Sequence, residues 1–294
     1  MEKHIRIIPR LDIKGPNLVK GIHLEGLRVL GKPEHFARYY YESGADELIY
    51  IDVVASLYNR NSLHDIICNT AKQVFIPLTV GGGLRNIKDI RDVLRAGADK
   101  VALNTAAIGN PKIIREAAES FGSSTIVISI EAIKQPGGRY LAYTDNGRGY
   151  TGVEILEWAK KVEELGAGEI LLTSIDREGT GSGYDIELTK MVSEAVSIPV
   201  IACGGAGKLS DINDVIANGK ADAVSLSSML HYGFVGDTPA FRKNQFESEG
   251  NIEFLISGKK FSMFDVADLR EIKAYLLMKK INCRHPLNKE VVNA

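Results

Sequence analysis

The sequence has few cysteines, no excess of charge of either sign and no long apolar run. Its 294 residues contain three cysteines, Cys68, Cys203 and Cys283, and this odd, dispersed set indicates neither a disulfide framework nor a zinc site. Lysine and arginine total 36 against 37 acidic residues, a net charge of −1, which argues against nucleic acid or an anionic membrane as a partner.

No segment approaches the roughly 20 apolar residues of a membrane span. The N-terminal residues MEKHIRIIPRLDIKG interrupt their apolar positions with charge every few residues, which is not the pattern of a signal peptide. We therefore expect a cytoplasmic protein.

Short β-rich segments alternate with amphipathic helical segments along nearly the whole chain. The eight predicted strands are Arg6–Asp12, Glu47–Val53, Ile76–Val80, Lys100–Asn104, Thr125–Glu131, Glu169–Asp176, Val200–Cys203 and Ala223–Ser227. The predicted helices between them are Pro33–Ser43, Ile87–Ala96, Pro111–Phe121, Gly152–Leu165, Asp185–Ala195 and Leu209–Asn218. Several strands are apolar almost throughout, as parallel strands covered on both faces are. Eight is the number that a closed parallel barrel requires.

The chain also contains two similar halves. GADELIYID from Gly44 matches GAGEILLTSID from Gly166, an offset of 166 − 44 = 122 residues. TVGGGLR matches ACGGAGK, and GADKVALNTAAI matches KADAVSLSSML, at nearly the same offset. A repeat of four β/α units is a half-barrel and not a solenoid repeat. The sequence predicts one (β/α)8 TIM barrel over residues 1–294, with an open doubly wound sheet as the main competitor.

Two glycine motifs occupy equivalent places in these halves. Gly81–Gly83 follows the third strand and Gly204–Gly207 follows the seventh, and polar pairs follow the fourth and eighth strands, at Asn104–Thr105 and Ser227–Ser228. Glycine lets backbone N–H groups approach an anion closely. Each motif alone could simply form a tight turn, but the symmetric pair indicates two phosphate sites across one barrel mouth. We expect an elongated small-molecule bisphosphate as ligand.

Several sequence motifs together resemble those of a known enzyme family. RLDIK, LVKG, TVGGG, GADKVALNTAA, GAGEILLTSIDREGT, SGYD and GGAGK occur in one order over residues 5–232 and 262–285, and this series resembles the cyclase subunit of imidazole glycerol phosphate synthase. The resemblance implies a heterodimer with a glutaminase subunit, whose ammonia travels through the barrel. It implies conversion of the ribulosyl-formimino-aminoimidazole carboxamide nucleotide to imidazole glycerol phosphate and aminoimidazole carboxamide ribotide in histidine biosynthesis, without a metal or organic cofactor.

The resemblance also implies site residues. Asp12 and Glu131 would carry the acid/base work, and both also lie at C-terminal ends of predicted strands, where catalytic side chains project. An Asp12 that only binds backbone amides, or a solvated Lys20 instead of a substrate-binding one, is the alternative. The implied phosphate positions are Gly83, Asn104 and Thr105 at one end and Gly179, Gly205, Ser227 and Ser228 at the other. Asp52 and Asp176 are expected to bind ligand hydroxyls or to orient loops.

At the opposite face, the resemblance implies a ring of charges that guards the ammonia entrance. Its members here are Arg6, Glu47, Lys100 and Glu169, which start four of the predicted strands. Ordinary stabilising salt bridges are the alternative interpretation.

Three features depart from the family pattern. Glu131 stands where the family has Asp, and Arg10 replaces a small residue. Arg10 shares one strand face with Arg6 and Asp12, so we expect its guanidinium in the lumen, paired with Asp12 or Glu131. Residues 233–261 form an insertion after the last strand, interpreted as either a peripheral loop or a loop that covers the mouth.

These departures leave a second function open. Relatives of this cyclase resemble ammonia-handling partners in surface-polysaccharide pathways. The alternative to the cyclase is therefore an ammonia-conducting accessory subunit for amidation of a sugar, without cyclase chemistry. The remaining alternatives are an isomerase or a barrel protein with an unassigned function.

Overall fold

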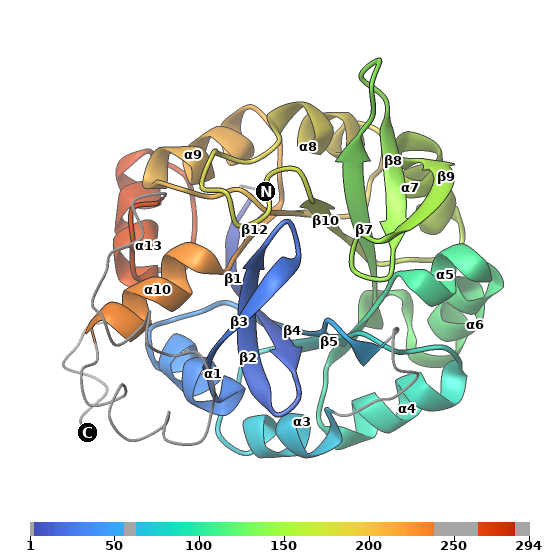
Figure 1. Cartoon of the computed structure of the whole chain (residues 1–294), viewed down its shortest axis with the longest axis horizontal. Helices are drawn as coiled ribbons and strands as arrows, with labels where there is room; N and C mark the ends of the chain where they lie inside the picture. Colours follow the sequence, from blue (N-terminus) through green and yellow to red (C-terminus); the bar gives the residue numbers. More distant parts are fainter. Residues whose placement is uncertain (1–2, 56–62, 238–263, 286–294) are drawn as a thin grey trace.

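In the computed structural model, which describes residues 3–55, 63–237 and 264–285, eight parallel strands form a closed barrel (Figure 1). In barrel order they are β1 (Arg6–Lys14), β4 (Leu48–Asp52), β5 (Leu78–Gly81), β6 (Lys100–Leu103), β7 (Ile126–Lys134), β10 (Glu169–Ser174), β11 (Val200–Cys203) and β12 (Ala223–Leu226). Pairing of β1 with β12 and of β7 with β10 closes the ring of strands. The prediction of a (β/α)8 barrel is therefore confirmed, and the open sheet is excluded.

Helices surround the barrel on the outside (Figure 1). They are α1 (Pro33–Glu42), α3 (His64–Ala71), α4 (Ile87–Ala96), α5 (Thr105–Gly109), α6 (Lys112–Phe121), α7 (Ile155–Glu164), α8 (Ile186–Ser193), α9 (Leu209–Ala217), α10 (Ser228–Asp237) and α13 (Leu269–Met278), with the short 3-10 helix η1 (Ser123–Thr125) before β7. In α4 the Asn86 side chain accepts a hydrogen bond from the Asp89 N–H, and Gly97 ends the helix at φ 119°, as expected for an N-cap and a C-terminal glycine. No helix in the described ranges is long and apolar enough to cross a membrane.

The side chains of each barrel strand alternate between the helices and the lumen. On β1, Ile7, Leu11 and Ile13 pack in the outer core under the helices, whereas Ile8 packs in the inner core of the lumen. This alternation with period two sends Arg6, Arg10 and Asp12 to the same side as Ile8. The lumen face of β1 therefore carries charge at three levels.

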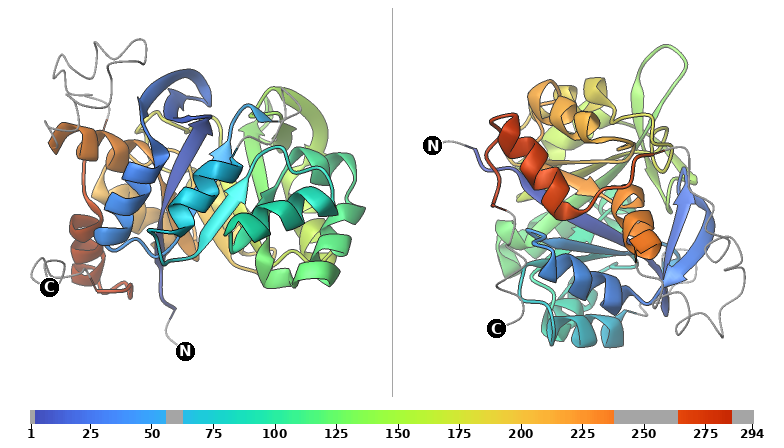
Figure 2. Two further views of the ribbon diagram at one scale, coloured as in Figure 1. Left: turned by 90° about the horizontal axis from the view of Figure 1, so that it is seen from below. Right: turned by 90° about the vertical axis from the view of Figure 1, so that its left-hand side faces the viewer.

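Two β-hairpins extend the barrel on its C-terminal side, and the sequence did not predict either one. The first, β2 (Asn17–Ile22) and β3 (Glu25–Gly31), follows β1, and the second, β8 (Tyr140–Thr144) and β9 (Gly149–Glu154), follows β7. Both rise on the same side of the barrel (Figure 2). Because β1 and β7 are diametrically opposed in the strand order, the hairpins extend the half-barrel repeat.

The predicted insertion falls only partly on described residues. Its first five residues, 233–237, belong to α10. The rest of it, up to residue 261, lies outside the described ranges.

Candidate active site

A closed ring of ion pairs spans the lumen at the N-terminal ends of the strands. Arg6 contacts Glu47 at 2.7 Å and also pairs with Glu169, while Lys100 Nζ lies 3.0 Å from Glu47 and 3.2 Å from Glu169. Each cation thus binds both carboxylates. All four predicted members of the ring are therefore joined by ion pairs across the lumen at this level.

Asp12 lies at the other end of the lumen and is held by two cations. Its Oδ1 accepts a hydrogen bond from Arg10 Nε at 2.8 Å, and its Oδ2 lies 3.9 Å from Lys20 Nζ. Lys20 also forms an ion pair with Glu178. All four side chains are buried. Burial opposes the charge on Lys20, but Glu178 and then Asp12 outweigh it and raise the pKa of the ammonium group. Lys20 is therefore a buried cation beside Asp12 and not a solvated surface lysine.

Glu131 faces Asp12 from the opposite strand, β7. Its Oε2 accepts a hydrogen bond from the Gly147 N–H at 2.9 Å. Burial raises the pKa of its carboxyl to about 7, although Arg10 and the Gly147 N–H act in the other direction. The two acids therefore differ in environment, because Asp12 contacts two cations while Glu131 contacts a backbone amide. Two carboxyl groups in such different environments suit an acid and a base that must act together.

Arg10 has the predicted buried partner, and that partner is Asp12. The guanidinium is 1% exposed and donates from Nη1 to Thr173 Oγ1 at 3.1 Å and to Cys203 Sγ at 3.5 Å.

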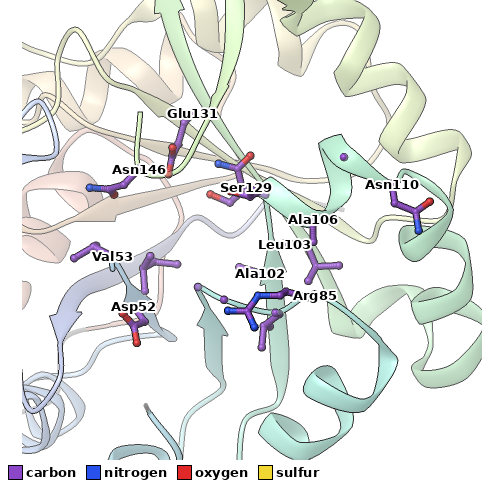
Figure 3. Close-up of a pocket in the computed structure, with 17 residues that line it drawn as sticks. Asp52, Val53, Arg85, Ala102, Leu103, Ala106, Asn110, Ser129, Glu131 and Asn146 are labelled. Carbon is purple, nitrogen blue, oxygen red and sulfur yellow. The ribbon is translucent and has the colours of Figure 1, made fainter. Parts of the chain in front are cut away.

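A cavity of about 390 Å³ opens at the mouth beside Glu131. The predicted site residues that line it are Asp52, Gly83, Asn104, Thr105 and Glu131. Figure 3 shows Glu131 and Ser129 on one side of this pocket and Asp52 on another. The Oδ1 atom of Asn104 is buried and has no hydrogen-bond partner in the described chain. The cavity therefore offers a bound ligand an unused polar atom as well as a glycine loop.

The glycine loop of this cavity depends on close backbone packing. Gly82 has φ 97°, and a Cβ there would lie 2.3 Å from the Asp52 carbonyl oxygen. Only glycine fits such a position. The loop therefore holds the Gly83 backbone beside the end of β4.

A second, much smaller cavity of about 20 Å³ lies on the opposite side of the mouth. It brings together the second predicted phosphate set, Gly179, Gly205, Ser227 and Ser228, and adds Glu178. The Ser227 hydroxyl donates to the Arg10 carbonyl at 3.0 Å. The β2–β3 hairpin is bonded to this region, because the His23 N–H donates to the Glu178 carbonyl at 2.8 Å.

The two remaining predicted acids orient the backbone. Asp52 Oδ1 accepts from the Val54 N–H at 3.1 Å, and Asp176 Oδ2 accepts from the Lys134 N–H at 2.8 Å. Asp52 also lines the larger cavity, whereas Asp176 lines neither of the two mouth cavities.

The structure adds two residues that the sequence analysis missed, Glu178 and His231. Glu178 belongs to the quoted DREGT motif, and its charge beside a glycine loop was the available signal. His231 Nε2 lies 3.0 Å from the Arg10 carbonyl and its Nδ1 lies 2.6 Å from the Tyr40 hydroxyl. Burial lowers the pKa of His231 to about 3, so the ring is neutral. Nε2 therefore donates to the carbonyl and Tyr40 donates to Nδ1.

Comparison with known proteins places this arrangement in a family. The profile of the histidine biosynthesis proteins matches residues 6–235. Imidazole glycerol phosphate synthase subunit HisF of Legionella pneumophila is 60% identical over 210 residues, which cover 71% of this chain and 99% of the relative. This chain belongs to the HisF family.

Two further relatives with the same name agree. The protein of Alkaliphilus metalliredigens is 47% identical over 230 residues, covering 78% of this chain and 91% of its own length. That of Prochlorococcus marinus is 52% identical over 229 residues, covering 77% and 89%. The resemblance inferred from the sequence motifs is confirmed. Because these relatives are named as subunits of a synthase, the family works as part of a complex.

Proposed function

We propose that this HisF-family chain is the cyclase subunit of an imidazole glycerol phosphate synthase. It uses ammonia from a glutaminase partner to convert the ribulosyl-formimino-aminoimidazole carboxamide nucleotide to imidazole glycerol phosphate and aminoimidazole carboxamide ribotide. The observation that carries this proposal is the acid pair. Asp12 and Glu131 lie on opposite strands of the barrel, and the larger of the two mouth cavities opens beside Glu131.

The two acids divide the proton transfers. Imine formation, elimination and ring closure each move protons, and a base and an acid in different environments can accept and supply them. Below pH 7, Glu131 is largely protonated, in keeping with its pKa of about 7, and acts as the acid. Asp12, held by Arg10 and Lys20, acts as the base.

The direct test supplies the isolated chain with an ammonium salt and the ribulosyl nucleotide and follows consumption of the nucleotide. Turnover without any glutaminase supports the cyclase. Absence of turnover, with glutaminase binding intact, contradicts it.

Two phosphate or sulfate ions are expected to bind at opposite sides of the mouth. One would contact the backbone at Gly83 and Thr105, and the other the backbone at Gly205 and Ser228. The smaller cavity must widen to admit its ion, because about 20 Å³ holds only a water-sized molecule. A crystal structure with millimolar phosphate checks this. Two empty sites would contradict the bisphosphate ligand.

The glutaminase partner is proposed to dock at the N-terminal face of the barrel and to form a heterodimer. The ring of Arg6, Glu47, Lys100 and Glu169 lies there. A hollow of about 420 Å³ beside the start of β5 is lined by Phe75, which is 75% exposed, and by Asp99. An exposed aromatic side chain next to a hollow is typical of a protein interface.

Replacing Lys100 by Ala is expected to lower glutamine-dependent turnover by about tenfold, equivalent to about 1.4 kcal/mol, and to spare ammonium-dependent turnover. Without Lys100, the carboxylates of Glu47 and Glu169 keep only Arg6, so an ammonium ion is retained at the ring. Parallel assays with glutamine and with ammonium measure the difference, and Lys88→Ala, on the exposed surface of α4, is the control. Equal glutamine-dependent rates in both variants would show that the ring has no gating role.

One observation favours the accessory subunit for sugar amidation, which remains the second candidate. Arg10 pairs with Asp12, and in the accessory subunit this buried pair would be a structural feature that replaces the acid/base role of Asp12. The assay with ammonium and the ribulosyl nucleotide separates the two functions.

A further inference from the structure

Arg10 lies between the ring at the N-terminal end of the lumen and the acid pair at its mouth. The lumen face of β1 carries Arg6, then Ile8, then Arg10 and finally Asp12, because alternate residues share a face. Ile8 belongs to the inner core, which confirms the direction of this face. Any small molecule that follows the axis from the ring to Asp12 must therefore pass the Arg10 side chain.

The guanidinium reaches across the lumen. Its Nε donates to Asp12 on its own strand, while its Nη1 donates to Thr173 on β10 and to Cys203 on β11. Two strands, β11 and β12, separate β10 from β1 in the barrel order. The side chain thus connects β1 with two strands that are not its neighbours in the barrel wall, and it is 1% exposed.

The backbone at Arg10 is fixed, so only the side chain can move. The carbonyl of Arg10 accepts hydrogen bonds from the Ser227 hydroxyl and from His231 Nε2, each at 3.0 Å. The guanidinium, in contrast, is held by one carboxylate, one hydroxyl and one thiol. Its position therefore depends mainly on Asp12, the only charged partner among these contacts.

We propose that Arg10 is a positioning residue that closes the lumen as a second barrier, above the ring, and opens it only when Asp12 releases the guanidinium. This inference rests on the proposed function. Substrate that engages Asp12 competes with Arg10 for the same carboxylate. Ammonia then reaches the mouth when substrate is already bound there, and wasteful release of ammonia into solvent is reduced.

The test compares two turnover rates of the same complex with its glutaminase. One rate is measured with saturating glutamine, and the other with an ammonium salt, which enters from the mouth. Their ratio reports passage through the lumen. A merely structural role of Arg10 changes both rates and the melting temperature but leaves the ratio unmoved.

Arg10→Ala is expected to raise the ratio of glutamine- to ammonium-dependent turnover by about tenfold, the effect of a barrier lowered by about 1.4 kcal/mol. Arg10→Lys keeps a charge near Asp12, but a single ammonium group cannot span Asp12, Thr173 and Cys203. Arg10→Lys is therefore expected to raise the ratio by a smaller factor. It also serves as the second variant for the measurement if Arg10→Ala fails to fold. Ile8→Ala is the matched control, because it enlarges the lumen on the same strand and leaves the guanidinium on Asp12.

A ratio that stays within about twofold of the parent in both Arg10 variants would overturn the inference. The same holds if Ile8→Ala raises the ratio as much as Arg10→Ala does. If every variant uses ammonium and none uses glutamine, no route for ammonia leads from the N-terminal face. That result would overturn both this inference and the proposed docking of a glutaminase at that face. Absence of ammonium-dependent turnover in the parent protein is a separate result, which contradicts the proposed cyclase function itself.

Discussion

Replacement of Asp12 by Asn is expected to lower ammonium-dependent turnover by about 10²- to 10⁴-fold, the usual cost of losing a general base. The amide retains the shape of the carboxylate but cannot accept a proton. The phosphate contacts lie in cavities that Asp12 does not line, so substrate should still bind through its phosphates. Single-turnover kinetics and equilibrium binding of the substrate measure the two effects separately.

The same substitution should also reduce stability. Arg10 and Lys20 are both buried beside Asp12, and removing one member of a buried ion pair typically costs about 3–5 kcal/mol. Lys20 retains Glu178, so Arg10 is the group left without a charged partner. Urea denaturation of the variant measures this loss. Asp92→Asn on the exposed surface of α4 removes the same charge where neither effect is expected.

Near-parent turnover by a stable Asp12→Asn variant would remove Asp12 from the mechanism. If the parent protein has no cyclase activity and the Asp12→Asn variant loses much of its stability, the accessory subunit is favoured instead.

The barrel strands and the ring could be predicted because their signals are local or repeated. Runs such as Val200–Cys203 are apolar on both faces, and the observed strand has the predicted bounds. Three ring members start their strands and Glu47 directly precedes β4, so the position of the ring follows once the strands are known. The duplicated glycine motifs likewise placed Gly83 and Gly205 at opposite sides of the mouth.

The hairpins and the burial of Lys20 could not be predicted in the same way. The β2–β3 hairpin pairs with β1 at Asp12 opposite Val19, but its residues carry mixed polar and apolar character that resembles a loop. Lys20 is buried because Glu178, far along the chain, lies against it. Arg10 left two possible partners in the sequence, and only the side-chain geometry selects Asp12 over Glu131. These features depend on tertiary contacts, which local periodicity does not encode.

Glu131 gives the second large expected effect, in which activity and stability change in opposite directions. Glu131→Gln should lower turnover by about 10²- to 10⁴-fold, because an amide cannot supply the proton. Glu131→Asp should preserve or raise turnover, since it restores the shorter side chain of the family. The change moves the carboxyl group by about 1 Å, and a displacement of that size can alter rates by about a hundredfold. Rates of the three proteins at pH 6 measure both effects. Full activity of the Gln variant would exclude Glu131 as the acid.

The stability effect follows from the pKa of Glu131. Burial raises this pKa from 4.5 to about 7, so the folded protein favours the protonated form. The stabilisation is fully present below pH 4.5, where the carboxyl is protonated in both states, and is lost as the pH rises through 7. A shift of this size corresponds to about 3 kcal/mol. Gln never ionises, so Glu131→Gln should abolish this part of the pH dependence.

Relative to the parent, Glu131→Gln should therefore gain stability between pH 5 and pH 9, by up to about 3 kcal/mol, while it remains inactive at both values. Urea denaturation of both proteins at pH 5, 7 and 9 gives the comparison. Catalytic groups often reduce stability, because burial that tunes an acid for function disfavours its charged form. An equal difference between the two proteins at all three pH values would show that Glu131 is already ionised in the folded state. In that case the acid of the pair would have to be sought elsewhere at the mouth.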